Sequence, residues 1–329
     1  MPKEITHFAL ARELAGALPG TSQFRGPVAD FPNLFLLGNV APDIFYFYLA
    51  GPDKEEVQTL GQPFHLPTAL ALGPVTDFLA QDASSPAMAL GAGVVSHIVS
   101  DTVFHPLVYY YAGMDGVHPG ATGRHRQFET AMDLHFWYLF SGETRLDRVV
   151  KGVEIPKEKL IHLLAGLFRP SPLPARRIWS ALGWFKRIQA LFGAKSVQTA
   201  VSWLDRSGYP LPPVLSGLVY PFDRPVRLPF FAGDIAYQDP CSGERVSTDL
   251  GSMVSRAVES GIRVLDILSR ALPAGGMDRP DARPGFRNRI LSDPGLPQIR
   301  PDLPVRDAKT WHRRRDIMPL LYRGLNFPA

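Results

Sequence analysis

The chain of 329 residues contains a single cysteine, Cys241. One thiol cannot form an internal disulfide, and it excludes a zinc ribbon or finger built from several cysteines. Any metal site must therefore be built from histidines and carboxylates. Charged residues are also few, at 20% of the chain, whereas hydrophobic residues make up 45%. Such a chain can bury a core and is not disordered as a whole.

Signal and membrane-spanning segments are not evident either. An amphipathic stretch follows the first four residues, where a signal peptide would have a basic region and an apolar run, so we expect a cytoplasmic protein. The apolar run 34–50 is short and interrupted by Asn39, Pro42 and Asp43. The longer run 86–113 carries Asp101 near its centre, which would cost about 2.5–3.5 kcal/mol in a bilayer. We therefore predict a helix buried inside a soluble protein and no transmembrane segment.

Helical spacing of apolar residues recurs along most of the chain. It predicts helices over 5–18, 32–48 (two short helices or one kinked helix), 66–81, 86–113 after a cap at Ser85, 122–140, 157–167, 175–204 and 247–272. Segment 209–238 is expected to be a proline-rich loop or a short strand, and no alternation of strands and helices is evident. The predicted fold class is all-α. Residues 1–145 would form a helical metal-binding unit, residues 146–272 additional helices that pack on it, and residues 273–329 a basic tail.

The net charge of +4 is concentrated near the C-terminus, where residues 271–329 carry 11 Lys and Arg against 6 Asp. The same segment contains nine of the 32 prolines. This composition is typical of a loosely structured arm that packs on its own domain. The alternative is transient contact with an anionic membrane surface, and we expect no stable nucleic-acid partner.

Histidines and carboxylates recur at helical spacing. His97, Asp101 and His105 stand four residues apart and therefore share one helix face. A buried Asp on an otherwise uncharged helix needs a partner, either a metal ion or a core hydrogen-bond network. His125 and Glu129 repeat the spacing, which suits a chelate but also arises by chance on exposed helices. Asp133, four residues further on, either binds a metal itself or orients a ligand.

The remaining histidines and one further Asp differ in their surroundings. His7 lies on the apolar side of the first predicted helix, Asp43 follows Pro42 in an apolar run, and His65 stands at the start of a predicted helix. His118 and His135 are expected to be structural or on the surface. His162 and His312 have no acidic partner at a useful spacing.

The order of these residues resembles the zinc-dependent phospholipase C family, which includes bacterial phospholipases C and the catalytic domain of glycosylphosphatidylinositol phospholipase D. The matching motifs are Thr6-His7, Gly38-x-x-x-Pro42-Asp43, His65, Ser96-His97-x-x-x-Asp101-x-x-x-His105 and His125-x-x-x-Glu129. The resemblance covers roughly residues 1–140. It implies a phospholipase C/nuclease-like helical bundle with a metal cleft.

The resemblance also implies the metal ligands. One zinc would be held by Asp43, His65, His97 and Asp101, and a second by His105, His125 and Glu129. A third would be held by His7, Asp101 and the N-terminal amino and carbonyl groups. Family members of the secreted type expose that terminus by signal cleavage, which is not expected here. We therefore expect two or three zinc ions per chain and favour two.

The implied activity is hydrolysis of a phospholipid or another phosphodiester by a zinc-activated hydroxide, with Asp43 as a proton acceptor. A nuclease or nucleotidase of the same fold is one alternative, and a non-catalytic helical protein with structural metals is another. Aromatic residues near the predicted cleft either line a lipid or nucleobase site or belong to the core: Phe45, Tyr46, Phe64, Tyr109, Tyr110 and Trp137.

Overall fold

The computed structural model describes residues 4–66, 68–114, 118–140, 145–169, 173–206, 217–220, 225–240, 242–272 and 317–323. The fold is all-α, as predicted. The α-helices are α1 (Glu4–Ala17), α2 (Arg25–Asp30), α3 (Pro32–Val40), α4 (Lys54–Thr59), α5 (Thr68–Gln81), α6 (Ser85–Ala112), α7 (Ala121–Leu139), α8 (Leu146–Lys151), α9 (Lys157–Leu167), α10 (Ala175–Phe192), α11 (Lys195–Arg206), α13 (Leu250–Ala271) and α15 (Met318–Leu321). The 3-10 helices are η1 (Ala41–Phe47), η2 (Gln62–His65) and η3 (Pro229–Phe231). Strands β1 (Ile235–Gln238) and β2 (Arg245–Thr248) pair antiparallel.

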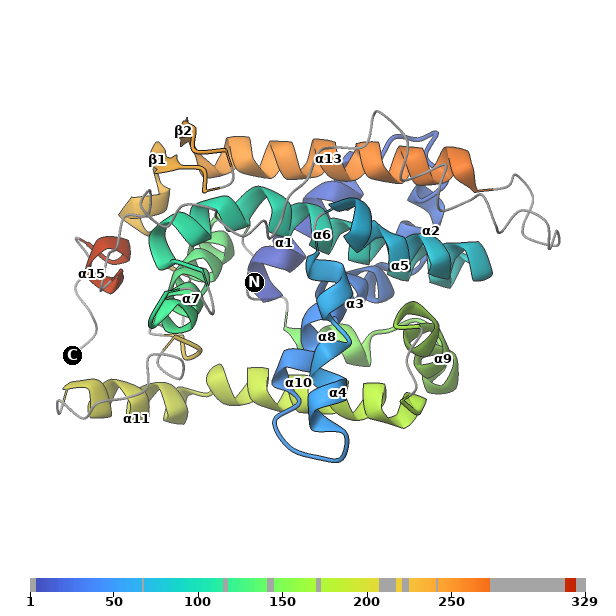
Figure 1. Cartoon of the computed structure of the whole chain (residues 1–329), viewed down its shortest axis with the longest axis horizontal. Coiled ribbons are helices and arrows are strands. Elements are labelled where there is room, and N and C mark those ends of the chain that lie inside the picture. Colours follow the sequence, from blue (N-terminus) through green and yellow to red (C-terminus); the bar gives the residue numbers. More distant parts are fainter. Residues whose placement is uncertain are drawn as a thin grey trace.

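Helix α6 is the centre of the fold. It begins with Pro86 in its first turn, where the missing N–H is not needed, and it contacts α1, α3, α5, α7 and α13. In Figure 1, α13 runs along one edge of the molecule and α10 and α11 along the opposite edge. Among the described residues, α6 alone is long and apolar enough to cross a membrane, yet 94% of that apolar window is buried inside the protein. This burial is that of a core helix.

Two glycines bring α3 and α6 into backbone contact. A Cβ on Gly38 would collide with the carbonyl oxygen of Leu90, and a Cβ on Gly93 would collide with that of Phe35. The close approach sets α3 firmly against the middle of α6. Because η1 follows α3 directly, the same contact brings Asp43 towards the polar face of α6.

The structure confirms one of the open alternatives among the predicted elements and differs from the prediction in two other places. Segment 32–48 forms two helices, α3 and η1, which is one of the two predicted forms. The single helix predicted over 175–204 was wrong, because α10 ends at Phe192 and α11 begins at Lys195, after Gly193 and Ala194. The helix predicted from residue 247 begins at Leu250, where the Asp249 carboxylate accepts from the Ser252 N–H, and the residues just before it form β2.

The later helices pack on the N-terminal ones. Helix α10 lies against η1, and α13 lies against α1 and α6. The division into a unit ending at residue 145 and added helices stays a prediction. The basic tail, except 317–323, lies outside the described residues, as does His312.

Candidate metal centre

The polar face of α6 carries the residues predicted from their spacing. The Oδ2 atom of Asp101 lies 3.3 Å from Nε2 of His97, and its Oδ1 atom lies 3.8 Å from Nε2 of His105. Asp101 and His105 are 2% exposed and His97 is fully buried. Because these side chains stand on an otherwise apolar helix, their charges must be balanced by groups from neighbouring elements.

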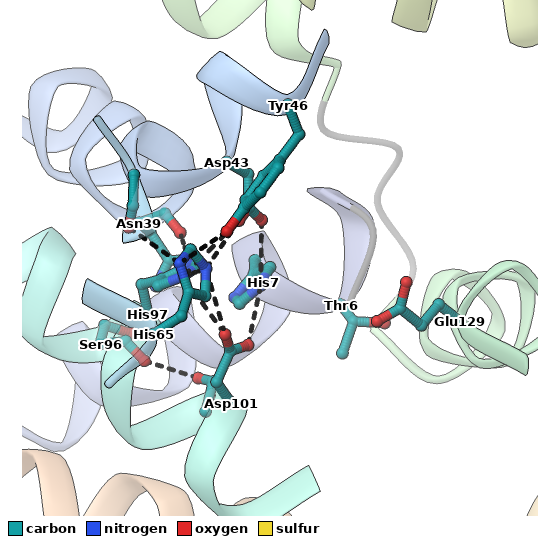
Figure 2. Close-up of polar contacts among 12 residues, drawn as sticks. Thr6, His7, Asn39, Asp43, Tyr46, His65, Ser96, His97, Asp101 and Glu129 are labelled. Carbon is teal, nitrogen blue, oxygen red and sulfur yellow. Dashed lines mark hydrogen bonds and ion pairs between the residues drawn. The ribbon is translucent and has the colours of Figure 1, made fainter. Parts of the chain in front are cut away.

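Three elements supply those groups. Helix α1 contributes His7, η1 contributes Asp43 and η2 contributes His65, and Figure 2 shows their side chains pointing towards His97 and Asp101. Nε2 of His7 lies 3.5 Å from Asp101 Oδ1 and 3.9 Å from Asp43 Oδ2. Nε2 of His65 lies 3.1 Å from Asp43 Oδ1 and 3.7 Å from Asp101 Oδ2. These five residues, His7, Asp43, His65, His97 and Asp101, form the first cluster.

Backbone carbonyls orient two of the imidazoles in the first cluster. Nδ1 of His97 lies 3.0 Å from the Asn39 carbonyl oxygen, and Nδ1 of His65 lies 2.9 Å from that of Gly61. A carbonyl only accepts, so each Nδ1 carries a proton, and in its neutral form each ring turns the lone pair of Nε2 inwards. The two Nε2 atoms are 3.2 Å apart.

Two lone pairs at that separation repel each other unless a proton or a cation lies among them. The carboxylate oxygens beside them, from Asp43 and Asp101, can neutralise a divalent ion. Imidazole nitrogen and carboxylate oxygen are typical zinc ligands, and each of these histidines has its other nitrogen fixed by a hydrogen bond. The residues present therefore fit a zinc ion.

The protonation states of three residues in the first cluster also suit metal binding. Burial lowers the pKa of His7 to about 4 and that of His97 well below its ordinary value. Burial opposes ionisation of Asp43, but the imidazoles of His97, His65 and His7 outweigh it and lower the pKa to about 2. Burial likewise acts against the charge on His65, whose pKa is nevertheless raised by Asp43 and Asp101. Ionised carboxylates and neutral imidazoles are the forms that bind a metal ion, so Asp43, His7 and His97 are already in the binding form. His65 would release its proton when the metal ion binds.

A second cluster comprises His105, His125 and Glu129. Each residue offers one ligand atom, and these atoms all lie within 4.8 Å of one another. Nε2 of His125 is 2.7 Å from Glu129 Oε1. Burial lowers the pKa of His105 well below its ordinary value. Burial acts to raise the pKa of Glu129, but the neighbouring His125 outweighs it, so the pKa of that carboxyl is lowered. The structure therefore brings together all eight residues predicted as ligands, in two neighbouring clusters joined through α6.

The predicted aromatic residues divide between the clusters and the core. The hydroxyl of Tyr46 lies 3.3 Å from Nδ1 of His65, and that of Tyr109 lies 3.4 Å from Nδ1 of His105. Phe45 and Phe64 are buried, and both pack edge-on against Phe168. Tyr110 and Trp137 pack against another part of the core.

The histidines that were not predicted as ligands, and Asp133, for which both ligation and orientation of a ligand were considered, lie outside the two clusters in the described part of the chain. The backbone N–H of Met114 donates to Nδ1 of His118, and that of Leu228 donates to Nδ1 of His135. His162 is exposed on α9. Asp133 is fully buried and lies outside both clusters, bonded to the first turn of α1.

Asn39 is the residue with a role in the site that the sequence did not predict. It is fully buried, and its side-chain amide, correctly oriented, donates to the His7 carbonyl oxygen and accepts from the His97 N–H. A buried amide directly after Gly38 in an apolar run was the available signal. Its partners, however, lie on two other helices, which spacing along the chain cannot reveal.

The fold and the two clusters define an all-α protein with a buried histidine and carboxylate centre suited to zinc. Residues 6–167 match the model of the zinc dependent phospholipase C family, and this part of the chain, which contains all eight candidate ligands, belongs to that family. No curated protein and no solved structure matches the chain. The family and the two clusters together support a zinc-binding, phospholipase-like hydrolase.

Proposed function

We propose that the protein hydrolyses a phosphodiester bond of a phospholipid and binds two zinc ions, one in each cluster. The observation that carries the proposal is the pair of Nε2 atoms of His65 and His97, which face each other at 3.2 Å beside two carboxylates. The second cluster has the same donor types, with one carboxylate and two imidazoles.

Charge favours an anionic substrate. The two clusters contain three carboxylates, from Asp43, Asp101 and Glu129, whereas two zinc ions carry four positive charges. The loaded centre would therefore keep a positive charge, which attracts a phosphodiester. Bound zinc would supply Lewis acidity towards the phosphoryl oxygens and lower the pKa of water.

The chain's own residues would orient the reactants. Because the pKa of Asp43 is about 2, its carboxylate is ionised at neutral pH and can accept a hydrogen bond from the attacking water. The hydroxyls of Tyr46 and Tyr109 lie beside histidines of the first and second clusters. They are suitably placed to donate to a phosphoryl oxygen or to fix those imidazoles.

The test starts with elemental analysis of protein purified without a histidine tag, for which we expect two zinc ions per chain. The same protein should release a phosphorylated headgroup from phosphatidylcholine vesicles, lose this activity with a chelator and regain it with added zinc. The exposed His162→Ala variant should behave like the wild type. Less than one ion per chain after zinc is resupplied would refute the proposal.

The products released from the two kinds of substrate distinguish the alternative functions. Release of nucleotides from single-stranded nucleic acid, without release of a headgroup, would replace the phospholipase by a nuclease. Full metal loading without hydrolysis of either substrate would leave a structural role for the metals.

A further inference from the structure

Asp133 joins α7 to the first turn of α1. Its Oδ1 atom accepts from the Thr6 N–H at 2.8 Å and from the Thr6 hydroxyl at 2.6 Å. Its Oδ2 atom accepts from the Ile5 N–H at 3.3 Å and from the Tyr220 hydroxyl at 2.8 Å. The carboxylate is fully buried, and four donors from two distant parts of the chain converge on it.

This arrangement caps α1 from outside. The first N–H groups of a helix have no partner within the helix, and a side chain just before the helix commonly accepts from them. Here a carboxylate 127 residues further along the chain accepts from the Thr6 N–H. A negative charge at a helix N-terminus is also favourable because of the helix dipole, and hydrogen bonds to an ionised group are strong.

The cap lies next to both clusters along the chain. Thr6 directly precedes His7, whose Nε2 atom faces Asp101 and Asp43, and neither ring nitrogen of His7 makes a hydrogen bond with the described residues. On α7, Asp133 stands one turn after Glu129 of the second cluster. Figure 2 shows Thr6 on the same ribbon as His7 but outside the converging side chains. The Asp133 carboxylate thus links the backbone that carries His7 to the helix that carries Glu129.

We propose that Asp133 is a positioning residue, which holds His7 in place and thereby sets the zinc affinity of the first cluster. The inference rests on the proposed function, because it presumes that this cluster binds zinc. Residues that orient metal ligands through hydrogen bonds change metal affinity by about ten- to hundredfold when they are replaced. A purely structural role would change stability and leave zinc affinity unaltered.

Thr6 provides the sharpest test, because matched variants are available. Thr6→Val keeps the side-chain shape and removes the hydroxyl donor, whereas Thr6→Ser keeps the hydroxyl. Asp133→Asn keeps Oδ1 and places an amide NH₂ opposite the Ile5 N–H, where it cannot accept. Zinc dissociation constants would be measured by competition with a chromophoric chelator, and the visible spectrum of the cobalt-loaded protein would report ligand geometry. Thermal unfolding of the metal-free proteins would be recorded in parallel.

We expect Thr6→Val and Asp133→Asn to weaken one of the zinc sites by about tenfold or more and to alter the cobalt spectrum. Thr6→Ser, which keeps the hydroxyl, should have the zinc affinity and the cobalt spectrum of the wild type. Wild-type zinc affinity and spectrum in Thr6→Val, whatever its stability, would overturn the positioning role even if Asp133→Asn failed to fold. Failure of the wild type itself to bind zinc would refute the proposed function as well, so the two failures are distinguishable.

Discussion

Asp101 is the carboxylate of the first cluster that also approaches the second cluster, at His105. One or other of its oxygens lies 3.3–3.8 Å from Nε2 of four histidines: His7, His65, His97 and His105. We therefore expect Asp101→Ala to be the most damaging single substitution, with loss of at least one zinc ion and a decrease in hydrolysis of about a hundredfold or more. Elemental analysis and initial rates on phosphatidylcholine would measure both effects.

Two histidines that belong to neither cluster serve as controls for the Asp101→Ala variant. His162 is exposed, and His118 accepts a backbone hydrogen bond from Met114. Both Ala variants should retain nearly wild-type metal content and activity. An inactive His118→Ala variant beside an active Asp101→Ala variant would show that the ligands are assigned wrongly.

Residue-scale prediction succeeded where one helix fixes the geometry. The spacing of His97, Asp101 and His105 determines their common face whatever surrounds the helix. Convergence of His7 and His65 with these residues needed the family resemblance, since both lie on other elements. The contacts of Asn39 and Asp133 remained unpredicted, because their partners are distant in the sequence and depend on the tertiary packing.

At the scale of elements, the contact between α3 and α6 positions the first cluster. A Cβ on Gly93 would lie 2.8 Å from the Asn39 nitrogen and closer still to the Phe35 carbonyl oxygen. Gly93→Ala should therefore separate the helices and destabilise the protein by about 1–3 kcal/mol. Because Asn39 and η1 would move with α3, zinc affinity should fall too.

Gly183→Ala is the matched control. This glycine lies inside α10, and a Cβ there would meet no atom within 4 Å. The substitution should stabilise the protein by up to about 1 kcal/mol, because alanine favours the helix. Urea unfolding would measure the stability of each variant, and chelator competition would measure its zinc affinity. Equal stabilities for Gly93→Ala and Gly183→Ala would contradict the packing argument.

Elements were predictable to the extent that local sequence decides them. The periodic helices were found at nearly their observed bounds: α1, α7 and α9 begin and end within one residue of the predicted ranges. The break between α10 and α11 was missed because apolar spacing continues across Gly193. A short strand was one of the two forms predicted for segment 209–238, which contains β1. Strand β2 and its pairing with β1 were missed, because a four-residue strand carries too little pattern and the pairing is fixed by register across a turn.

The whole molecule places a polar centre between two apolar clusters. Helix α6 contributes Val94, Val95 and Ile98 to one apolar cluster and Val103, Phe104 and Leu107 to the other. His97, Asp101 and His105 lie along the same stretch of α6, and α1 contributes to both clusters as well. Burying ionisable groups this deeply is costly without compensation. Zinc binding would therefore stabilise the native state, by about 2.7 kcal/mol for each site at a free zinc concentration one hundred times its dissociation constant.

Stability should also depend on pH through His135, which lies away from the proposed metal sites. It is 2% exposed, its Nδ1 accepts from the Leu228 N–H at 2.9 Å, and burial, with a contribution from Arg227, lowers its pKa to about 4. In the unfolded chain the pKa returns to about 6.5. Between these values the unfolded state binds a proton that the folded state does not. The stabilising contribution is therefore complete above pH 6.5 and is lost as the pH falls towards 4.

His135→Asn tests this contribution, because the Asn Oδ1 atom can accept from the Leu228 N–H but does not titrate. Between pH 7 and 5, the free energy of unfolding of the wild type should fall by about 2 kcal/mol more than that of the variant. Denaturant unfolding of both proteins at saturating zinc would measure the difference, since any pH-dependent loss of zinc should affect the two proteins alike. Parallel pH profiles would show that His135 binds its proton equally in the folded and unfolded states, against the pKa that its burial indicates.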